Sequence, residues 1–357
     1  MYIGQKGDGL SDIPARDPNI DEVQSVSAGK FRRYHGEGIK QLLDIKTMAL
    51  NFRDMFRVVA GTFQSWRLLR KLKPEVIFIK GGFVGVPVGF AAAKLHIPFI
   101  THDSDALPGL ANRIIARWAV KHAVAMPKEI YAYKQGQTFT VGVPVVAEYQ
   151  RVTPELQARY RQELSVPADA PMVFVIGGGL GSQRINDAVI HCVPELLQEF
   201  PNLVIVHGVG RANESVASTS YDELVSTDKR PQVQVAGYLH DVYRYSGAAD
   251  VIVTRAGATN LAEFAVQGKA CIVIPSPFLA GGHQLKNAKY LEEHQATEQI
   301  PEDIVMKQPE LLSKMISELL HNPEHRAALG ERFTSFGNPH AARDLAELLL
   351  NEVDTQK

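Results

Sequence analysis

Short hydrophobic runs alternate with amphipathic, helix-like segments along most of this 357-residue chain. In the first half, the pattern predicts strands at residues 75–79, 97–101, 122–126 and 138–141, and helices at 86–95 and 112–120. The second of these helices is expected to open near Asp105, which could cap it. Because consecutive parallel strands need a crossover helix between them, this alternation predicts a parallel sheet covered by helices.

The second half repeats the alternation after a proline-containing connection at residues 142–169, which is expected to include one helix. Strands are predicted at 172–176, 203–207, 232–236, 250–254 and 271–274, and helices at 185–200, 258–267 and 341–353. The sequence therefore predicts an α/β fold with two doubly wound, Rossmann-like domains facing a cleft. We place these domains at 1–146 and 147–357, and the last helix could pack back on the first domain.

The composition is that of an ordinary soluble protein, with 45% hydrophobic residues, 22% charged residues and a formal net charge of −1. It excludes fibrous, disordered and collagen-like chains. Two cysteines, Cys192 and Cys271, cannot supply a disulfide framework or a thiolate zinc site, which fits a reducing cytosol. The uncharged stretch at residues 81–93 is too short to span a bilayer, and we expect no export signal.

The charge is unevenly distributed along the chain. Between residues 30 and 80, twelve Lys or Arg residues occur with four acidic residues, a local charge of +8, whereas the remainder carries −9. The same window contains apolar residues at helical spacing: Leu42, Leu43, Met48, Leu50, Phe52, Met55, Phe56, Phe63 and Trp66. Such a stripe beside cationic flanks is typical of a membrane-surface segment, and also of an amphipathic helix pair packed on a sheet with a solvated basic rim.

Two loops that follow predicted strands have features of anion sites. The glycines of G-G-G-L-G-S at 177–182 would let backbone N–H groups approach a diphosphate, although a tight strand-to-helix turn needs glycines as well. Residues 255–260 lead into a helix whose first turn carries small side chains. One turn further, Glu263 could accept hydrogen bonds from two ribose hydroxyls, or act only as a helix-dipole partner.

Further polar residues follow the ends of other predicted strands. The segment 274–288 offers imidazole and amide donors, or alternatively surface caps, in His283, Gln284 and Asn287. In the first half, the loops at 81–87 and 101–105 should share the carboxyl edge of the sheet. That edge would carry the three candidate bases His102, Asp103 and Asp105, with a buried structural histidine as the alternative for His102.

Five motifs occur in order over nearly the whole chain: K-G-G-F-V-G-V-P, H-D-S-D-A-L-P-G-L-A-N-R, V-I-G-G-G-L-G-S-Q-R-I-N, T-R-A-G-A-T-N-L-A-E-F and I-P-S-P-F-L-A-G-G-H-Q-L-K-N-A. Together they resemble the MurG family of glycosyltransferases. The resemblance implies the two-domain GT-B fold, with the nucleotide sugar held mainly by the second domain and a lipid-linked acceptor by the first. It also implies that the enzyme works peripherally at the cytoplasmic face of the cell membrane, which favours the membrane-surface interpretation of the basic window.

The reaction implied by the resemblance is an inverting transfer of N-acetylglucosamine (GlcNAc) from UDP-GlcNAc to undecaprenyl-diphosphate-linked N-acetylmuramyl-pentapeptide. This is the conversion of lipid I to lipid II in peptidoglycan synthesis. It would require no metal, no other cofactor and no nucleic acid. The departing UDP would be stabilised by helix N-termini and backbone donors, and a base would take the proton of the acceptor hydroxyl.

The resemblance assigns roles to individual residues of this chain. The donor site would comprise Gly178, Gly179, Gly181, Leu239, Ala258, Thr259, Asn260, Leu261, Ala262, Glu263 and Gln284. The acceptor site would comprise Gly81, Gly82, Phe83 and Gly85, and the catalytic candidates are His102 and Asp105.

Several positions depart from the family pattern. Gly179 stands where the family typically has a serine, and Asp105 where it usually has asparagine. Val143 and Val146 replace the asparagine and arginine of its G-N-P-V-R motif, which removes a diphosphate contact. The chain opens M-Y-I-G-Q-K, which looks like the end of a later strand, and the family's first glycine loop, G-G-T-G-G-H, has no counterpart. We therefore expect the first domain to be truncated at its N-terminus, with roughly 30 to 40 further residues in the native protein.

Three other functions remain open at this point. A related UDP-sugar transferase acting on another lipid acceptor would keep the donor motifs and change the acceptor loops. An inactive UDP-sugar-binding partner subunit would fit the missing first loop and Val146. A dinucleotide oxidoreductase is disfavoured, because the chain lacks the spaced G-x-G-x-x-G of such sites.

Overall fold

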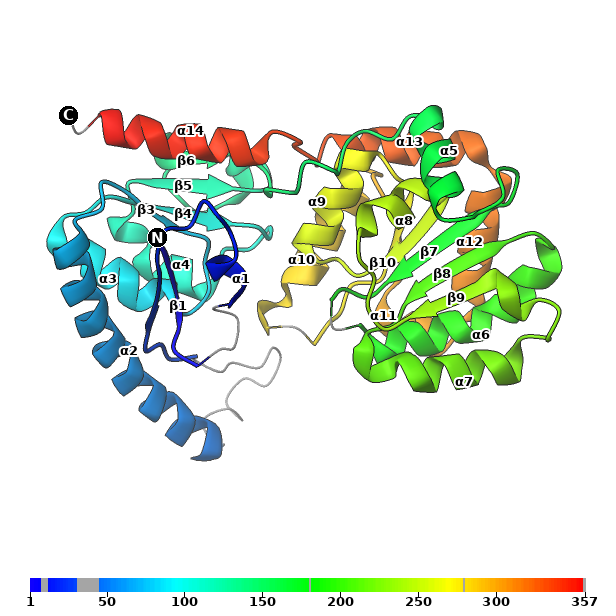
Figure 1. The fold of residues 1–357 in the computed structure, drawn as a ribbon, viewed down its shortest axis with the longest axis horizontal. Coiled ribbons are helices and arrows are strands. Elements are labelled where there is room, and N and C mark those ends of the chain that lie inside the picture. The colour runs from blue at the N-terminus through cyan, green and yellow to red at the C-terminus, as the bar shows by residue number, and fades with distance from the viewer. Residues whose placement is uncertain (8–11, 31–44, 180, 279, 356–357) are drawn as a thin grey trace. The chain divides into compact units, whose positions relative to one another are not determined.

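A computed structural model describes residues 1–7, 12–30, 45–179, 181–278 and 280–355 (Figure 1). The chain forms two compact units. Unit 1 comprises Met1–Gly142, Phe278–Gly281 and Ala342–Lys357, and unit 2 comprises Val143–Pro277 and Gly282–Ala341. The break between Gly142 and Val143 lies slightly before the expected position between residues 146 and 147.

Unit 1 contains a parallel sheet in the order β3-β4-β5-β6 and a separate parallel pair, β1-β2. The strands are β1 (Tyr2–Gln5), β2 (Val23–Val26), β3 (Ile77–Ile79), β4 (Phe99–Asp103), β5 (Lys121–Val124) and β6 (Thr138–Thr140). The α-helices are α1 (Asp12–Ala15), α2 (Ile45–Leu72), α3 (Gly85–Leu95), α4 (Leu110–Ile115) and α14 (Ala341–Asp354).

Neighbouring residues of β4 point to opposite faces of the unit 1 sheet, and each face has its own core. Phe99 packs in the cluster formed with α2, α3 and α4, whereas Ile100 packs with Leu345 and Leu348 of α14. Figure 1 shows α14, in red, lying along β5 and β6. An ion pair of 3.1 Å between the ammonium of Lys121 and the carboxylate of Glu352 fastens the helix to the sheet.

Unit 2 contains a larger parallel sheet in the order β12-β11-β10-β7-β8-β9. Its strands are β7 (Met172–Ile176), β8 (Val204–Gly208), β9 (Val233–Ala236), β10 (Val251–Thr254), β11 (Cys271–Val273) and β12 (Glu298–Gln299). Its α-helices are α5 (Pro154–Glu163), α6 (Gln183–Glu199), α7 (Glu214–Leu224), α8 (Val242–Ala248), α9 (Ala258–Gln267), α10 (His283–Glu293), α11 (Glu302–Val305), α12 (Glu310–His321) and α13 (Pro323–Thr334).

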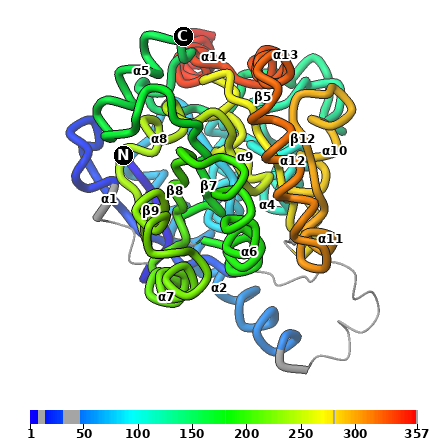
Figure 2. Tube along the Cα trace, turned by 90° about the vertical axis from the view of Figure 1, so that its right-hand side faces the viewer, coloured from blue at the N-terminus to red at the C-terminus, as the bar shows by residue number. Residues whose placement is uncertain are grey.

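Helices cover both faces of this sheet, as Figures 1 and 2 show. Val173 and Val175 of β7 pack with α6, α7 and α12, whereas Met172 and Phe174 pack with α5, α8, α9, α10 and α13. Because both faces are covered, the strands are almost continuously hydrophobic rather than alternating, as expected of a parallel sheet.

The strand order reverses between β7 and β10. From β7 the chain proceeds outward through β8 to β9, and it then returns to β10 on the other side of β7, where Thr254 pairs with Ile176. In open α/β sheets, ligands bind beyond the carboxyl ends of the strands at such a switch point. The loops after β7 and β10 are the two anion-site loops identified from the sequence.

Each strand predicted from the sequence is present, with ends within two residues of those expected. Strands β2 and β12 were not predicted, because neither has a long hydrophobic run. The predicted cap at Asp105 is wrong. Helix α4 begins at Leu110 with Gly109 as its N-cap, and the N–H of Gly109 donates instead to the carboxylate of Asp103.

Candidate functional site

The loop after β7 needs glycine at two positions for conformational reasons. Gly178 and Gly181 have φ angles of +96° and +74°, which L-residues with side chains rarely adopt. A Cβ atom at Gly181 would also clash with the carbonyl oxygen of Val209. At Gly179, by contrast, a Cβ atom would meet no described atom within 4 Å. Leu180 lies outside the described residues.

Helix α9 begins directly after the loop that follows β10. Its N-cap is Gly257, and among the described residues no side chain caps this end. The N–H groups of Ala258, Thr259 and Asn260 have no carbonyl partner within the helix, so the first turn can donate to an anion. The side chains of Leu261 and Ala262 are buried, and the N–H of Leu261 already donates to the carbonyl of Gly257 at 3.0 Å, so these two residues support the first turn from inside the helix.

Arg255 connects the two anion-site loops. Its guanidinium donates to the hydroxyl of Ser182 at 2.5 Å and to the carboxylate of Glu302 at 2.7 Å. Glu302, 1% exposed, also lies 3.7 Å from the guanidinium of Arg184. The sequence reasoning missed Glu302, because nothing in its spacing from Arg255 indicates that α11 returns to this edge of the sheet.

Glu263 lies one turn into α9, beside the hydroxyl of Tyr149. Burial raises the pKa of the Glu263 carboxyl to about 7, while the interaction with Tyr149 lowers it. A partly buried carboxylate beside one hydroxyl keeps acceptor capacity for further hydroxyl groups. Tyr149 was not predicted as a site residue, since an aromatic residue in a connection has no distinguishing sequence signal.

Other predicted donor residues lie at the same edge of the unit 2 sheet. Leu239 follows β9 and packs against Gly208 at the end of β8. Gln284 is buried, and its amide oxygen accepts from the N–H of Ser276, which follows β11. The amide nitrogen of Gln284 is therefore the group that could donate to a ligand. Asn287 donates to the carbonyl of Ala256 and ties α10 to the loop after β10.

The predicted acceptor glycines form the connection from β3 to α3 in unit 1. Gly81 and Gly82 have φ angles of +105° and +80°, so both positions require glycine. Gly85 is required by packing, because a Cβ atom there would lie 2.6 Å from the side chain of Ile79. Phe83 is half-buried. The loop therefore presents backbone groups and one aromatic ring at the carboxyl edge of β3.

His102 is fully buried at the end of β4. Its Nε2 lies 2.8 Å from the carbonyl oxygen of Gly142 and therefore carries the proton, and its Nδ1 lies 3.3 Å from the hydroxyl of Ser104. Burial lowers the pKa of this imidazole, which keeps it neutral. The arrangement favours the structural role for His102 over that of a general base, because both ring nitrogens are engaged inside the protein.

Asp103 also has a structural environment. Its carboxylate accepts hydrogen bonds from the N–H of Gly109, the amide of Asn112 and the hydroxyl of Tyr133, at 2.9, 2.9 and 2.8 Å. These bonds hold the loop from β4 to α4. Asp105 is half-buried in the same loop. Of the three candidate bases, it is therefore the one that the loop leaves nearest to solvent.

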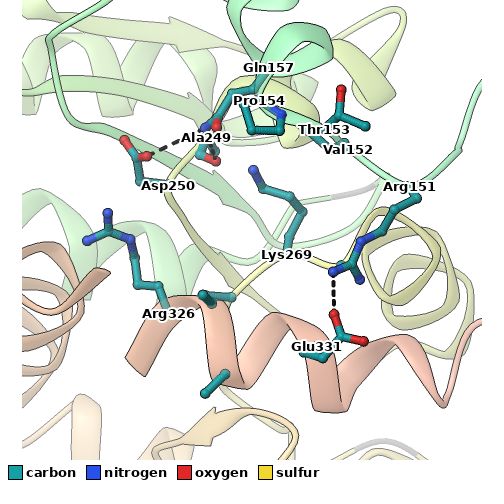
Figure 3. Close-up of a pocket in the computed structure, with 14 residues that line it drawn as sticks. Arg151, Val152, Thr153, Pro154, Gln157, Ala249, Asp250, Lys269, Arg326 and Glu331 are labelled. Carbon is teal, nitrogen blue, oxygen red and sulfur yellow. Dashed lines mark hydrogen bonds and ion pairs between the residues drawn. The ribbon is translucent and has the colours of Figure 1, made fainter. Parts of the chain in front are cut away.

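A cavity of about 650 Å³ lies at the opposite, amino-terminal edge of the unit 2 sheet (Figure 3). Its cationic side chains have structural partners. Lys269 donates to the carbonyl of Gly247 at the end of α8, and Arg326 donates to two carbonyls at the end of α12. Arg151 pairs with Glu331 at 2.6 Å. Since cations stabilise helix C-termini, helix capping accounts for this cluster without a ligand.

Comparisons with known proteins match both units. Residues 22–124 match the glycosyltransferase family 28 N-terminal domain, and residues 172–349 match the family's C-terminal domain. A relative from Natranaerobius thermophilus, named UDP-N-acetylglucosamine–N-acetylmuramyl-(pentapeptide) pyrophosphoryl-undecaprenol N-acetylglucosamine transferase, is 30% identical over 98% of this chain and 90% of its own. The chain belongs to the MurG family. A Treponema pallidum protein of the same name is 32% identical over 92% of this chain and 82% of its own.

Solved structures agree on the fold of the family. MurG from Acinetobacter baumannii superimposes with a TM-score of 0.72 at 23% identity, covering 98% of this chain and 90% of that protein. A UDP-GlcNAc 2-epimerase from Neisseria meningitidis, solved with UDP-GlcNAc, gives a TM-score of 0.60 at 12% identity and covers 98% of each chain. The MurG resemblance, the glycosyltransferase class and the two-unit α/β fold predicted from the sequence are thus confirmed.

Proposed function

We propose that this chain transfers GlcNAc from UDP-GlcNAc to undecaprenyl-diphosphate-linked N-acetylmuramyl-pentapeptide, forming lipid II in peptidoglycan synthesis. The observation that carries the proposal is the pairing of two anion-site loops at the switch point of unit 2, joined by Arg255 and followed by Glu263. The names of the family relatives support the same donor and acceptor.

In this reaction the 4-hydroxyl of the acceptor attacks the anomeric carbon of GlcNAc with inversion. A bond forms between that oxygen and the anomeric carbon, and the bond to the diphosphate breaks, so UDP leaves with the electron pair. The amides at Gly177–Ser182 and at the first turn of α9 would stabilise the charge that develops on the diphosphate. Glu263 would accept hydrogen bonds from the ribose, and no metal is needed for either task.

Asp105 is our choice for the base that takes the hydroxyl proton. His102 is buried with both nitrogens bonded, and Asp103 is held by three donors. Asp105 is half-buried and follows β4, the strand beside β3, whose loop the family resemblance assigns to the acceptor. A positioned base contributes a factor of about 10² to 10⁴ in rate.

We further propose that α2 places the enzyme on the anionic membrane surface. Within the described residues, no helix has the length and hydropathy to cross a bilayer. One stripe of α2 nevertheless exposes Phe52, Met55, Phe56, Val59 and Phe63, which are 45–64% exposed. Their spacing of three or four residues places them on one side of the helix.

The surroundings of this stripe fit a lipid surface. It continues into an apolar groove of about 480 Å³ between α2 and α3, lined by Trp66 and Phe90 and bordered by Lys94. Each well-placed cation contributes about 1 kcal/mol at an anionic leaflet, and buried aromatic area adds to this. The same helix carries the exposed cations Arg53, Arg57, Arg67, Arg70 and Lys71.

The remainder of the basic window is only partly within the described chain. Lys30, which precedes α2 in the sequence, is exposed. The basic residues 32, 33 and 40 and the apolar residues Leu42 and Leu43 lie outside the described residues. The membrane proposal therefore rests on α2 and its groove.

The transfer is tested by incubating the protein with labelled UDP-GlcNAc and a lipid I analogue, and separately with a diacylglycerol acceptor. Label in the lipid II product supports the proposal. Label only in the diacylglycerol product would favour a different transferase of the same clan. UDP binding in calorimetry without transfer to either acceptor would favour the inactive partner subunit.

Membrane association is tested by sedimentation with anionic and neutral vesicles at rising salt. We expect binding to anionic vesicles that weakens as salt screens the cations. An absence of binding at low salt would contradict the proposal, and a concentration-dependent dimer would point to a second copy of the chain on the stripe.

A further inference from the structure

The connection that begins unit 2 is fastened to the donor helix α9. A turn closes where the N–H of Tyr149 donates to the carbonyl of Val146 at 3.1 Å. Three residues further, the N–H of Val152 donates to the carbonyl of Gln267, at the end of α9, at 3.2 Å. The hydroxyl of Tyr149 meets Glu263, one turn before Gln267. The connection therefore contacts α9 at two successive turns.

Packing fixes the ring of Tyr149. The side chain is 6% exposed, and its ring lies edge-on to that of Tyr243 with 6.2 Å between centroids. Tyr243 contacts Tyr160 in the same way at 5.9 Å, and its carbonyl accepts from the amide of Gln267 at 2.7 Å. Burial and the charge of Glu263 raise the pKa of the Tyr149 phenol, so the hydroxyl keeps its proton. The protonated phenol can therefore donate to the neighbouring carboxyl of Glu263.

We propose that Tyr149 is a positioning residue for the nucleotide: its hydroxyl holds the Glu263 carboxylate so that the remaining lone pairs accept the vicinal ribose hydroxyls of a uridine diphosphate. This inference rests on the proposed function of Glu263. An ionised carboxylate has about four acceptor sites, so one bond from Tyr149 leaves room for both hydroxyls. Hydrogen bonds to a charged group are stronger than those between neutral groups. The orientation of the carboxylate should therefore have a measurable effect on nucleotide affinity.

The charged side chains around α9 are occupied elsewhere. On the connection, Arg151 pairs with Glu331 of α13. On α8, Arg244 pairs with Glu163 and Asp241. The two influences that act on the ionisation of Glu263 are thus its burial, which raises its pKa to about 7, and the bond from Tyr149, which lowers it. Loss of the phenol should therefore both release the carboxyl and favour its protonated form.

The test compares the wild-type chain with Tyr149→Phe, using calorimetry with UDP and with 2′-deoxy-UDP. We expect Tyr149→Phe to weaken UDP binding about 5- to 20-fold at neutral pH, a typical effect for a hydrogen bond to a charged group. The ratio of the affinity for UDP to that for 2′-deoxy-UDP should be at least twofold smaller in Tyr149→Phe than in the wild type. The reason is that the Glu263 carboxylate, which would accept from the 2′-hydroxyl, is no longer held in place. The pH midpoint of UDP binding should also move upward.

Tyr160→Phe is the matched control, since it removes a phenol from the same aromatic cluster without touching Glu263. It should leave UDP affinity and the 2′-deoxy penalty unchanged. In a Glu263→Ala background, Tyr149→Phe should have no further effect on UDP binding. An unchanged affinity, deoxy penalty and pH midpoint in a folded Tyr149→Phe chain would overturn the positioning role and leave the donor site intact. A wild-type chain that takes up no UDP would overturn both proposals.

Discussion

The guanidinium of Arg255 donates a hydrogen bond of 2.5 Å to the hydroxyl of Ser182 and thereby joins the loops after β10 and β7. The same guanidinium pairs with the buried carboxylate of Glu302 at 2.7 Å. Two loops that are far apart in the sequence are thus held together at the switch point of the unit 2 sheet. Preorganised donors of this kind stabilise developing charge without reorganising during the reaction.

Replacing Arg255 by Met should weaken both the fold and the donor site. Among the described residues, the change leaves Arg184, at 3.7 Å, as the remaining cation beside the buried carboxylate of Glu302, and breaking a buried pair costs about 3 to 5 kcal/mol. Thermal unfolding and UDP titration would measure the two effects. Adding Glu302→Gln should recover part of the stability, because the unpaired charge is removed. Equal stability of the single and double variants would contradict this account.

Replacing Gly179 by Ser should strengthen donor binding. A Cβ atom added at this position would have open space around it, with no described atom within 4 Å, and the new hydroxyl could donate to the diphosphate. One net hydrogen bond of about 1 kcal/mol corresponds to roughly a fivefold lower KM for UDP-GlcNAc. Gly181→Ser is the matched control, and it should destabilise the chain because of its φ of +74° and the nearby carbonyl of Val209. A higher KM in Gly179→Ser would contradict the prediction.

Donor affinity should depend on pH through Glu263. Its carboxyl has a pKa of about 7 in the folded chain, and the ionised form would accept the stronger hydrogen bonds from the two ribose hydroxyls. The KM for UDP-GlcNAc should therefore rise as the pH falls below about 7, by up to about tenfold per pH unit, while Glu263→Gln should have a high KM that is flat with pH. A wild-type KM that is constant from pH 6 to about 8 would exclude this role.

The same group should affect stability with the opposite sign. The folded pKa, about 7, exceeds the ordinary value of 4.5, so the folded chain binds more protons than the unfolded chain between these two pH values. Stability should therefore fall as pH rises through this window, by on the order of 3 kcal/mol. Melting temperatures of the ligand-free wild type and Glu263→Gln across this window would measure the effect. The advantage of Glu263→Gln should grow toward pH 8, which is beyond the folded pKa by roughly one unit.

Asp105 and Asp103 should respond differently to conversion to Asn. Asp105→Asn removes the proposed base of this chain, although asparagine is the usual residue of the family at this position, and it should lower kcat about 10²- to 10⁴-fold with little change in melting temperature. Asp103→Asn disturbs a carboxylate that accepts three hydrogen bonds, so its main effect should be lower stability. Steady-state kinetics and thermal unfolding on both variants separate the two roles. An Asp105→Asn chain with full kcat would remove Asp105 as the base.

Replacing Phe52 and Phe56 by Ser should reduce vesicle binding without loss of the fold. Both rings are more than half exposed, at 61% and 57%, so little core packing is lost. Sedimentation with anionic vesicles would measure the change, with transfer to a water-soluble acceptor analogue as the activity control. We expect at least a tenfold weaker vesicle affinity, which corresponds to the loss of more than about 1.4 kcal/mol. Unchanged vesicle binding would show that this stripe is not the contact surface.

The sequence by itself determined the strand and helix order, because continuous hydrophobic runs and glycine turns are local signals. It also identified the loops at 177–182 and 255–260 as candidate anion sites, because their glycines and small side chains are visible in the sequence itself. Its motifs established the family, since five ordered segments match over nearly the whole chain. The position of His102 at a strand end was predicted as well, but its burial was only one of two alternatives, because the partner of its ring, the carbonyl of Gly142, lies forty residues later.

Only the tertiary structure decided which of these residues act together. The bond between Arg255 and Ser182, the buried Glu302 and the contact of Tyr149 with Glu263 join segments separated by tens of residues, and no local periodicity encodes such contacts. The same holds for the proposed choice among His102, Asp103 and Asp105, because burial and hydrogen bonding set the ionisation and the accessibility of each side chain. The local sequence therefore identified the candidate residues of the site, and long-range packing decided their contacts, burial and ionisation.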